Sequence, residues 1–269
     1  MNVAVVLPIY KSRLKTYEKL SLLSLKKQLS KKYEIYIITH KELTDFITKH
    51  PLLKKYKLIY FPKRFFTYQG YNSLLKSLPF YLAFKQFEYI LIYQTDCLIF
   101  NNQLDYWLKK GYDYIGAPWF VKDKKNNYQF IGVGNGGFSL RKVSSFIKVL
   151  NNYKNFRIKL KIFLKNIFPS LRILLYKLCI NRDYPKYHLG CRNEDVFWSF
   201  AAKQIVPSFR VASYSDALKF SFEKYPSFCF KENKNKLPLG CHGFQKYERK
   251  FWARFITKAI RRSSSTSLR

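Results

Sequence analysis

Residues 89–100, "YILIYQTDCLIF", place a single carboxylate inside an otherwise apolar run. The first five residues are apolar or aromatic, which is typical of a buried strand. Asp96 comes just after them, and charged side chains are rarely fully buried unless they are paired or bind a metal. Two interpretations fit this segment by itself. Asp96 caps a turn or helix, or it holds a divalent cation beside a diphosphate, because Mg²⁺ and Mn²⁺ prefer oxygen ligands.

Apolar runs alternate with helical patterns on the N-terminal side of this strand. Such alternation predicts an α/β fold with a mostly parallel sheet, in which ligands bind beyond the carboxyl ends of the strands. A helix is expected over residues 71–87, interrupted at Pro79. The other predicted elements are strands at 3–10, 33–40, 57–62 and 89–93 and helices at 15–29 and 41–50.

A glycine cluster lies in the segment 131–142, "IGVGNGGFSLRK". Gly136 and Gly137 permit a close approach of the chain to a ligand, or a positive φ. Asn135 offers an amide to sugar hydroxyls. A tight bend before a strand explains the same glycines, and both explanations can hold together.

The segment 193–205, "NEDVFWSFAAKQI", predicts a helix with Asn193 as its N-cap. Glu194 and Asp195 fall in its first turn, where acids stabilise a helix through its dipole without any catalytic duty. Trp198 on this helix is expected to pack in the core.

The net charge is strongly positive, with 50 Lys and Arg against 16 Asp and Glu, or +34. Such a charge favours polyanions, although AT-rich codon usage would also enrich lysine. Residues 151–180 and 245–262 mix basic with apolar side chains, which predicts peripheral binding to an anionic membrane surface.

The same composition argues against other classes of protein. We expect neither an integral membrane protein nor a secreted one, because no long apolar run or secretory signal is visible. Five scattered cysteines without a C-x-x-C pair fit a reducing cytoplasm. No nucleic-acid-binding signature appears, so no specific nucleic acid is expected as a partner.

Five segments occur in a fixed order: "QTD" after a strand, "YDYIGAPW", "GNGGFSLR", "NEDVFWS" and "PLGCHGF". Together they resemble a bacterial-type family of GT-A-fold glycosyltransferase-like proteins and, more distantly, the β-1,3-galactosyltransferase type. The resemblance spans roughly residues 57–245, without the segment 151–185. It implies a GT-A-like, Rossmann-like mixed sheet flanked by helices. We expect one catalytic domain over 1–245, a basic helical insertion over about 151–185 and a basic tail over 246–269.

The resemblance also implies roles for residues around the donor. Asp96 matches the last acid of the family's D-x-D metal motif, whereas Gln94 departs from the pattern by replacing the first acid. His242 matches the histidine that several such enzymes supply as a metal ligand. The implied metal ligands are therefore Asp96 and His242. The implied donor-binding residues are Gln94, Thr95, Asp96, Asn135, Gly136 and Gly137.

On the acceptor side, the resemblance makes Asp195 the catalytic base of an inverting transfer and Glu194 a second catalytic residue. We expect Asp195 to be ionised at neutral pH because it opens a helix. Trp119 is a candidate stacking residue for the acceptor, and Arg141 is expected to pair with a carboxylate or a phosphate.

The implied activity is a metal-dependent hexosyl transfer, with Mn²⁺ or Mg²⁺, from a UDP-sugar to a saccharide or lipid-linked saccharide in surface polysaccharide synthesis. The expected location is the cytoplasmic face of the membrane. Two alternatives stay open: a non-catalytic basic protein that binds nucleic acid or membrane surfaces, and a transferase that has lost activity through Gln94.

Overall fold

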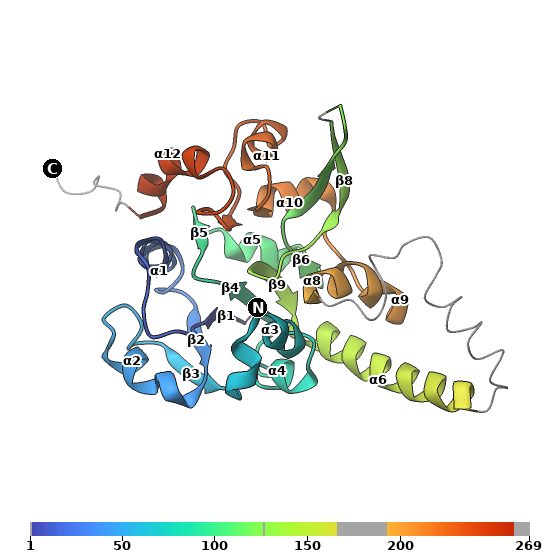
Figure 1. Cartoon of the computed structure of the whole chain (residues 1–269). Coiled ribbons are helices and arrows are strands. Elements are labelled where there is room, and N and C mark those ends of the chain that lie inside the picture. Colours follow the sequence, from blue (N-terminus) through green and yellow to red (C-terminus); the bar gives the residue numbers. More distant parts are fainter. Residues whose placement is uncertain (1, 126, 166–192, 261–269) are drawn as a thin grey trace.

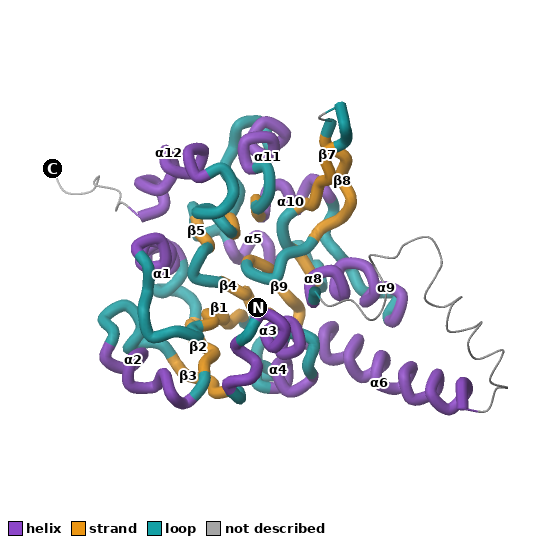
Figure 2. Tube along the Cα trace, viewed as in Figure 1, coloured by secondary structure: helices purple, strands orange, loops and turns teal. Residues whose placement is uncertain are grey.

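The computed structural model describes residues 2–125, 127–165 and 193–260 (Figure 1). Most of the predicted insertion, from residue 166 onward, and the last residues of the predicted tail therefore lie outside the described residues. The described chain forms a central sheet with helices on both faces (Figure 2).

The central sheet has six strands in the order β3-β2-β1-β4-β9-β6. The first four in this order run parallel, and β9 is antiparallel to both of its neighbours. All residues of β1 and β4 are buried, as expected for continuous apolar strands covered on both faces. The predicted mostly parallel mixed sheet is confirmed. Its strands are β1 (Val3–Pro8), β2 (Glu34–Thr39), β3 (Lys57–Tyr60), β4 (Tyr89–Tyr93), β6 (Tyr114–Ile115) and β9 (Phe138–Lys142).

Two hydrophobic clusters cover the two faces of this sheet. On one face the odd positions of β1 pack against α1 (Thr16–Gln28), α2 (Thr44–Lys49), α5 (Leu104–Lys109) and α10 (Tyr214–Phe220). On the other face the even positions pack against α3 (Tyr68–Leu74), α4 (Leu78–Leu82), α6 (Val143–Lys165) and α9 (Ala202–Ile205). The short helix α8 (Glu194–Val196) comes before α9 along the chain. Short 3₁₀ turns at Lys41–Leu43 and Lys63–Phe66 precede α2 and α3, and a π-helical turn at Phe197–Ala201 joins α8 to α9.

A second, smaller sheet extends the fold beside the carboxyl end of β4. It has the order β10-β11-β5, with β10 at Ser221–Phe222, β11 at Gly240–His242 and β5 at Cys97–Ile99. A third cluster packs it against α11 (Pro226–Glu232) and α12 (Arg249–Ile260). A hairpin of β7 (Pro118–Lys122) and β8 (Tyr128–Val133) projects above these helices in Figure 1.

Two details differ from the expectations. The segment 71–87 holds two helices that break after Leu74, and the second helix begins at Leu78, just before Pro79, whose ring is tolerated only in a first turn. The C-terminal segment is not a free tail where it is described. Trp252 is 0% exposed and stacks on Phe100 with their ring centroids 5.7 Å apart, so the apolar face of α12 is used by the core. The prediction that Trp198 packs in the core is confirmed.

Candidate active site

A cavity of about 360 Å³ opens where the strand order reverses. The chain builds β2 and β3 on one side of β1 and then places β4 on the other side, so the carboxyl ends of β1 and β4 form the switch point at which α/β sheets bind ligands. Tyr10 follows β1, Gln94 follows β4, and both line the cavity. Asp195 and His242 line it as well.

The small sheet brings His242 to Asp96. In the antiparallel register of β11 and β5, His242 lies opposite Cys97, the residue after Asp96. The Nε2 atom of His242 is 3.2 Å from Oδ1 of Asp96 and 3.2 Å from Oε1 of Gln94. The Nδ1 atom of His242 is 3.1 Å from Oε1 of Glu223. The structure therefore joins both predicted metal ligands and adds a carboxylate that was not predicted.

The charges in this cluster shift one another. Burial lowers the pKa of His242, but the carboxylates of Asp96 and Glu223 outweigh it and raise the pKa to about 10. Burial by itself raises the pKa of Asp96, yet the neighbouring His242 brings the net pKa below its usual value. A protonated His242 therefore balances the carboxylates of Asp96 and Glu223.

The cluster fits a divalent cation that takes part of its ligands from substrate. Two ligand atoms held at right angles, each about 2.1 Å from Mg²⁺, lie about 3 Å apart, close to the separations of Nε2 from Oδ1 and Oε1. Within the described residues, no group of three or more His, Cys, Asp and Glu side chains is arranged to hold a metal ion. A cation held here would take Asp96, His242 and the amide oxygen of Gln94 as its protein ligands, and phosphate oxygens of a substrate would complete the set, as is common for Mg²⁺.

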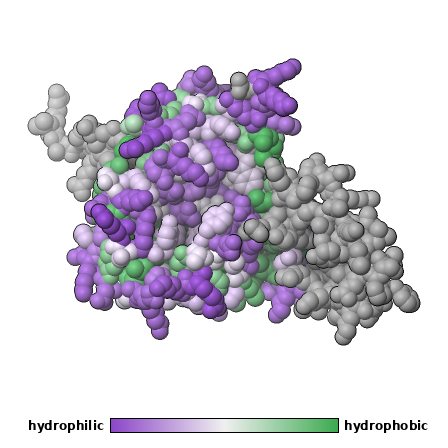
Figure 3. All heavy atoms as spheres, in the orientation of Figure 1, coloured by the Kyte–Doolittle hydropathy of each residue, from purple (hydrophilic) through white to green (hydrophobic). Residues whose placement is uncertain are grey.

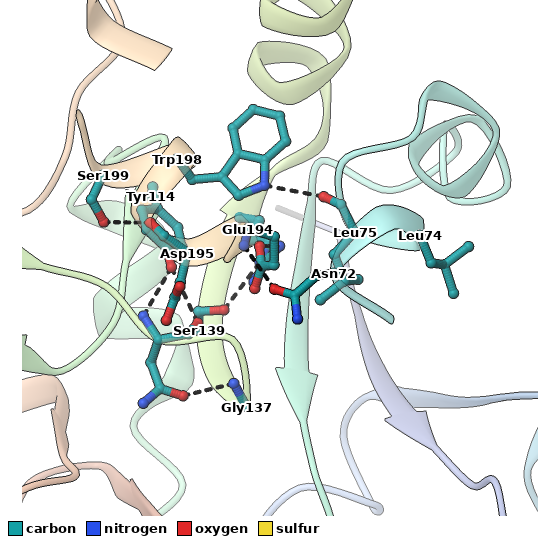
Figure 4. Close-up of polar contacts among 12 residues, drawn as sticks. Asn72, Leu74, Leu75, Tyr114, Gly137, Ser139, Glu194, Asp195, Trp198 and Ser199 are labelled. Carbon is teal, nitrogen blue, oxygen red and sulfur yellow. Dashed lines mark hydrogen bonds and ion pairs between the residues drawn. The ribbon is translucent and has the colours of Figure 1, made fainter. Parts of the chain in front are cut away.

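Glu194 is held at the opposite wall by a buried ion pair. Arg141, fully buried on β9, donates two hydrogen bonds of 2.9 Å to the Glu194 carboxylate and one of 3.0 Å to Tyr81. Burial opposes the charge of Arg141, but Glu194 outweighs it and raises the pKa of the guanidinium. Asn72 of α3 accepts a hydrogen bond from the Glu194 amide (Figure 4). Of the two predicted partners for Arg141, the structure shows the carboxylate.

Asp195 lies beside Glu194 at the start of α8 (Figure 4). Burial, followed by the charges of Glu194 and Glu223, raises its pKa to about 7. We expected the helix start to keep Asp195 ionised at neutral pH, but with a pKa of about 7 the carboxyl is only partly ionised there. The helix that begins at α8 continues through the π-helical turn into α9, so its dipole favours the ionised form, yet loss of solvation outweighs it.

The glycine cluster is shaped by the protein's own side chains. A Cβ on Gly137 would lie 2.2 Å from Nε2 of His242, and a Cβ on Gly136 would lie 2.7 Å from a Glu194 oxygen. The side-chain oxygen of Asn135 does not face a ligand, because it accepts hydrogen bonds from the backbone amides of Gly137 and Phe138, at 2.7 and 2.8 Å. Asn135 therefore shapes the bend that presents the two glycines.

A family model described as "Protein of unknown function (DUF5672)" matches residues 55–242. The chain belongs to the DUF5672 family. The range matched by the DUF5672 model contains Asp96, Asp195 and Glu223 and ends at His242, whereas Tyr10 lies outside it. No curated protein matches the sequence.

Solved structures similar to this DUF5672 chain include three glycosyltransferases. The apo form of mouse xyloside xylosyltransferase 1 is 11% identical with a TM-score of 0.49, over 90% of this chain and 98% of that one. The galactosyltransferase LgtC, in complex with donor and acceptor sugar analogues, is 10% identical with a TM-score of 0.48, over 99% and 97%. Core-mannan synthase A from Aspergillus fumigatus, in an Mn/GDP form, is 10% identical with a TM-score of 0.40. That alignment spans 56% of this chain and 63% of the mannan synthase.

Five predicted site residues do not line the cavity: Thr95, Asp96, Trp119, Asn135 and Arg141. Thr95 is buried and donates its hydroxyl to Glu18 at 2.8 Å, and Arg141 and Asn135 are buried within the protein as described above. Trp119 lies on β7 against Gly134 and Phe200. The cavity is lined by the remaining predicted residues, Gln94, Gly136, Gly137, Glu194, Asp195 and His242, and Asp96 contacts His242.

Sequence reasoning missed several residues of the cavity. Tyr10 and Tyr68 line it with exposures of 49% and 74%, and exposed aromatic rings suit the apolar face of a sugar. Tyr68 donates a hydrogen bond of 3.0 Å to Asn193. One feature of Glu223 resembles Asp96, because each acid follows the end of a strand: Glu223 comes directly after β10, and Asp96 comes three residues after the last residue of β4.

Proposed function

We propose that this chain is a glycosyltransferase that transfers a sugar from a nucleoside diphosphate donor, a UDP-sugar, to a saccharide or lipid-linked saccharide in surface polysaccharide synthesis. One observation carries the proposal. One cavity at the switch point of the sheet is lined by His242, which contacts Asp96, and by the half-buried carboxylate of Asp195. The motif resemblance supports the same activity.

The donor would bind at the Asp96 side of the cavity. Asp96, His242 and Gln94 would hold Mn²⁺ or Mg²⁺, which neutralises charge on the departing diphosphate. Gly136 and Gly137 line this wall, and their lack of side chains makes room for Glu194 and His242. His242 lines the cavity and is 17% exposed, and Asp96, 25% exposed, lies in contact with it.

Asp195 would act as the general base of an inverting transfer. The acceptor oxygen attacks the anomeric carbon, the bond from that carbon to the diphosphate oxygen breaks, and the acceptor proton passes to Asp195. A pKa of about 7 suits this role, because a base whose pKa lies near the working pH is both available and strong enough to take the proton. Glu194 would hold Asp195 in place through its pair with Arg141.

A panel of nucleotide sugars tests this proposal by release of the nucleoside diphosphate, with Mn²⁺ and with excess EDTA. We expect UDP release that requires the cation and is lost in Asp96→Ala. NMR of the product should show an inverted anomeric configuration. Full activity in EDTA would contradict the metal role, and a retained configuration would contradict the role of Asp195.

We also propose that the protein binds peripherally to the cytoplasmic face of a membrane. None of the helices in the described part of the chain has the length and hydropathy that a bilayer crossing requires. Five lysines line a groove at the amino ends of β2 and β3, away from the cavity, and two of them form ion pairs, Lys32 with Asp105 and Lys57 with Glu34. The face of the molecule in Figure 3 is largely hydrophilic. Anionic headgroups attract such lysines at about 1 kcal/mol each. The lysines of this groove are Lys26, Lys31, Lys32, Lys55 and Lys57.

Flotation with anionic liposomes at low salt tests the membrane proposal. We expect co-flotation that is lost with salt and reduced when the five groove lysines are replaced by Gln. Liposome binding without UDP release from any nucleotide sugar would instead favour a non-catalytic surface-binding protein.

A further inference from the structure

The edge strand β10 of the small sheet is followed by a second carboxylate, which lies beside the candidate cation site. β10 runs parallel to β11, with Ser221 beside Gly240 and Phe222 beside Cys241. One step further along this register lies Glu223, beside His242. Its Oε1 atom is 3.1 Å from Nδ1 of His242, and its side chain is only 16% exposed.

We propose that Glu223 is the positioning residue of the site, accepting the Nδ1–H of His242 and thereby turning the Nε2 lone pair toward Asp96 and Gln94. This inference rests on the cation site of the proposed function. Histidines that bind metals commonly donate their other ring N–H to a carboxylate, which fixes the tautomer and strengthens the bond to the metal.

The contacts of the two ring nitrogens of His242 show why Glu223 is the residue that sets the tautomer. On the Nε2 side the ring meets Asp96 and Gln94, each at 3.2 Å, and the backbone of Gly137 packs closely against that edge. Gly137 therefore sets where the ring lies, whereas the partner of Nδ1 sets which nitrogen carries the proton. Removing that partner lets the ring take the other tautomer, with a proton on the nitrogen that must bind the cation.

Glu223 also explains how the site can work with Gln94 in place of an acid. A Gln at this position contributes an oxygen ligand without charge. The second negative charge is supplied instead by Glu223, through the imidazole of His242. The site then carries two carboxylates, one on each side of the histidine.

The test measures Mn²⁺ binding by the full chain in the presence of UDP, and the EPR signal of free Mn²⁺ is the readout. We expect Glu223→Ala to weaken binding about 10–100-fold, the usual loss for such outer partners. Glu223→Gln, which keeps an acceptor and loses the charge, should fall between Ala and wild type. The matched control is Glu232→Ala, an exposed acid on α11 that pairs with Tyr214. Binding of the Ala variant within twofold of wild type would overturn the proposal.

A second readout reports the tautomer directly. With only four histidines in the chain, ¹⁵N spectra of the imidazoles can be assigned with His242→Asn. In the presence of Mg²⁺ and UDP we expect His242 to carry its proton on Nδ1 in wild type and in Glu223→Gln, and to lose that signature in Glu223→Ala. An unchanged tautomer in the Ala variant contradicts the proposal. If the Ala variant does not fold, Glu223→Gln decides: wild-type Mn²⁺ affinity overturns the inference.

The inference and the proposed function fail in different ways. Mn²⁺ binding that depends on Glu223, without transfer from any nucleotide sugar, supports the positioning role and contradicts the transferase. Transfer that persists in EDTA, without measurable Mn²⁺ binding, supports the transferase and overturns the role of Glu223.

Discussion

Asp195 shows how burial can outweigh position in a helix. Its carboxylate lies in the first turn of α8, where a dipole would favour the ionised form, yet burial and two neighbouring acids raise its pKa to about 7. The raised pKa turns an ordinary acid into a group that can take a proton near neutral pH. Loss of contact with solvent is therefore what distinguishes Asp195 from the exposed acids on the protein surface.

We predict that turnover rises with pH through about pH 7, because the base must lose its proton before it can accept one from the acceptor. Asp195→Asn should lower kcat by roughly 10²–10⁴ and remove this limb of the profile, while UDP still binds. The measurement is UDP release between pH 5.5 and 9. A limb that persists unchanged in the Asn variant would assign the titration to another group.

Gly137 matters at the same scale because it leaves space for a ring. A methyl group there would lie 2.2 Å from Nε2 of His242. We predict that Gly137→Ala displaces His242 and weakens Mn²⁺ binding with UDP by about tenfold or more. Gly136→Ala is the contrast, since its methyl group would meet Glu194 instead. It should lower stability more than Mn²⁺ affinity, and equal effects of both variants on the metal would contradict this division.

At the scale of elements, the start of α8 is fastened to two other parts of the fold. Arg141 on β9 holds the Glu194 side chain, and Asn72 on α3 holds the Glu194 amide. Tyr68 of α3 adds a hydrogen bond to Asn193. These contacts place Asp195 at the cavity.

We predict that Glu194→Gln destabilises the fold by about 3–5 kcal/mol, because it leaves the buried Arg141 without its counterion. Urea denaturation measures the change. Glu34→Gln is the control, since Glu34 forms an exposed pair with Lys57, and pairs in contact with solvent contribute little to stability. A Glu194→Gln protein with wild-type stability but no turnover would show that Glu194 takes part in the chemistry itself.

At the scale of the whole molecule, three clusters divide the core, and the third depends on the C-terminal helix. Trp252 and Phe251 of α12 pack with β5 and β11, the two strands that bring Asp96 and His242 together. The candidate cation site therefore rests on a part of the core that the chain completes only near its end.

We predict that Trp252→Ala destabilises the protein by about 3–5 kcal/mol, the usual cost of removing a large buried aromatic side chain. The loss should appear in a thermal melt and be accompanied by weaker Mn²⁺ binding. Binding to anionic liposomes should not change, because the indole is fully buried. Weaker liposome binding by a folded Trp252→Ala protein would indicate instead that Trp252 faces the membrane, as the mixture of basic and apolar residues over 245–262 predicted.

The sequence by itself determined the sheet and one end of the site. Continuous apolar runs predicted β1 and β4, because a strand covered on both faces needs no polar positions. Pro79 indicated an interruption of the helical segment, although the break falls earlier, after Leu74, and Asp96 stood out as an acid shortly after a strand. These are local properties, and each can be read within a dozen residues.

Only the tertiary structure decided which distant side chains meet. Gln94 and His242 are 148 residues apart, and the register of β5, β11 and β10 sets His242 between Asp96 and Glu223. Arg141 and Glu194 are 53 residues apart, and their ion pair shows that Arg141 is buried and holds Glu194 in place. Burial, likewise, set the pKa of Asp195 and the place of Trp252. Strand register and burial arise from the packing of the whole chain, so no local pattern contains them.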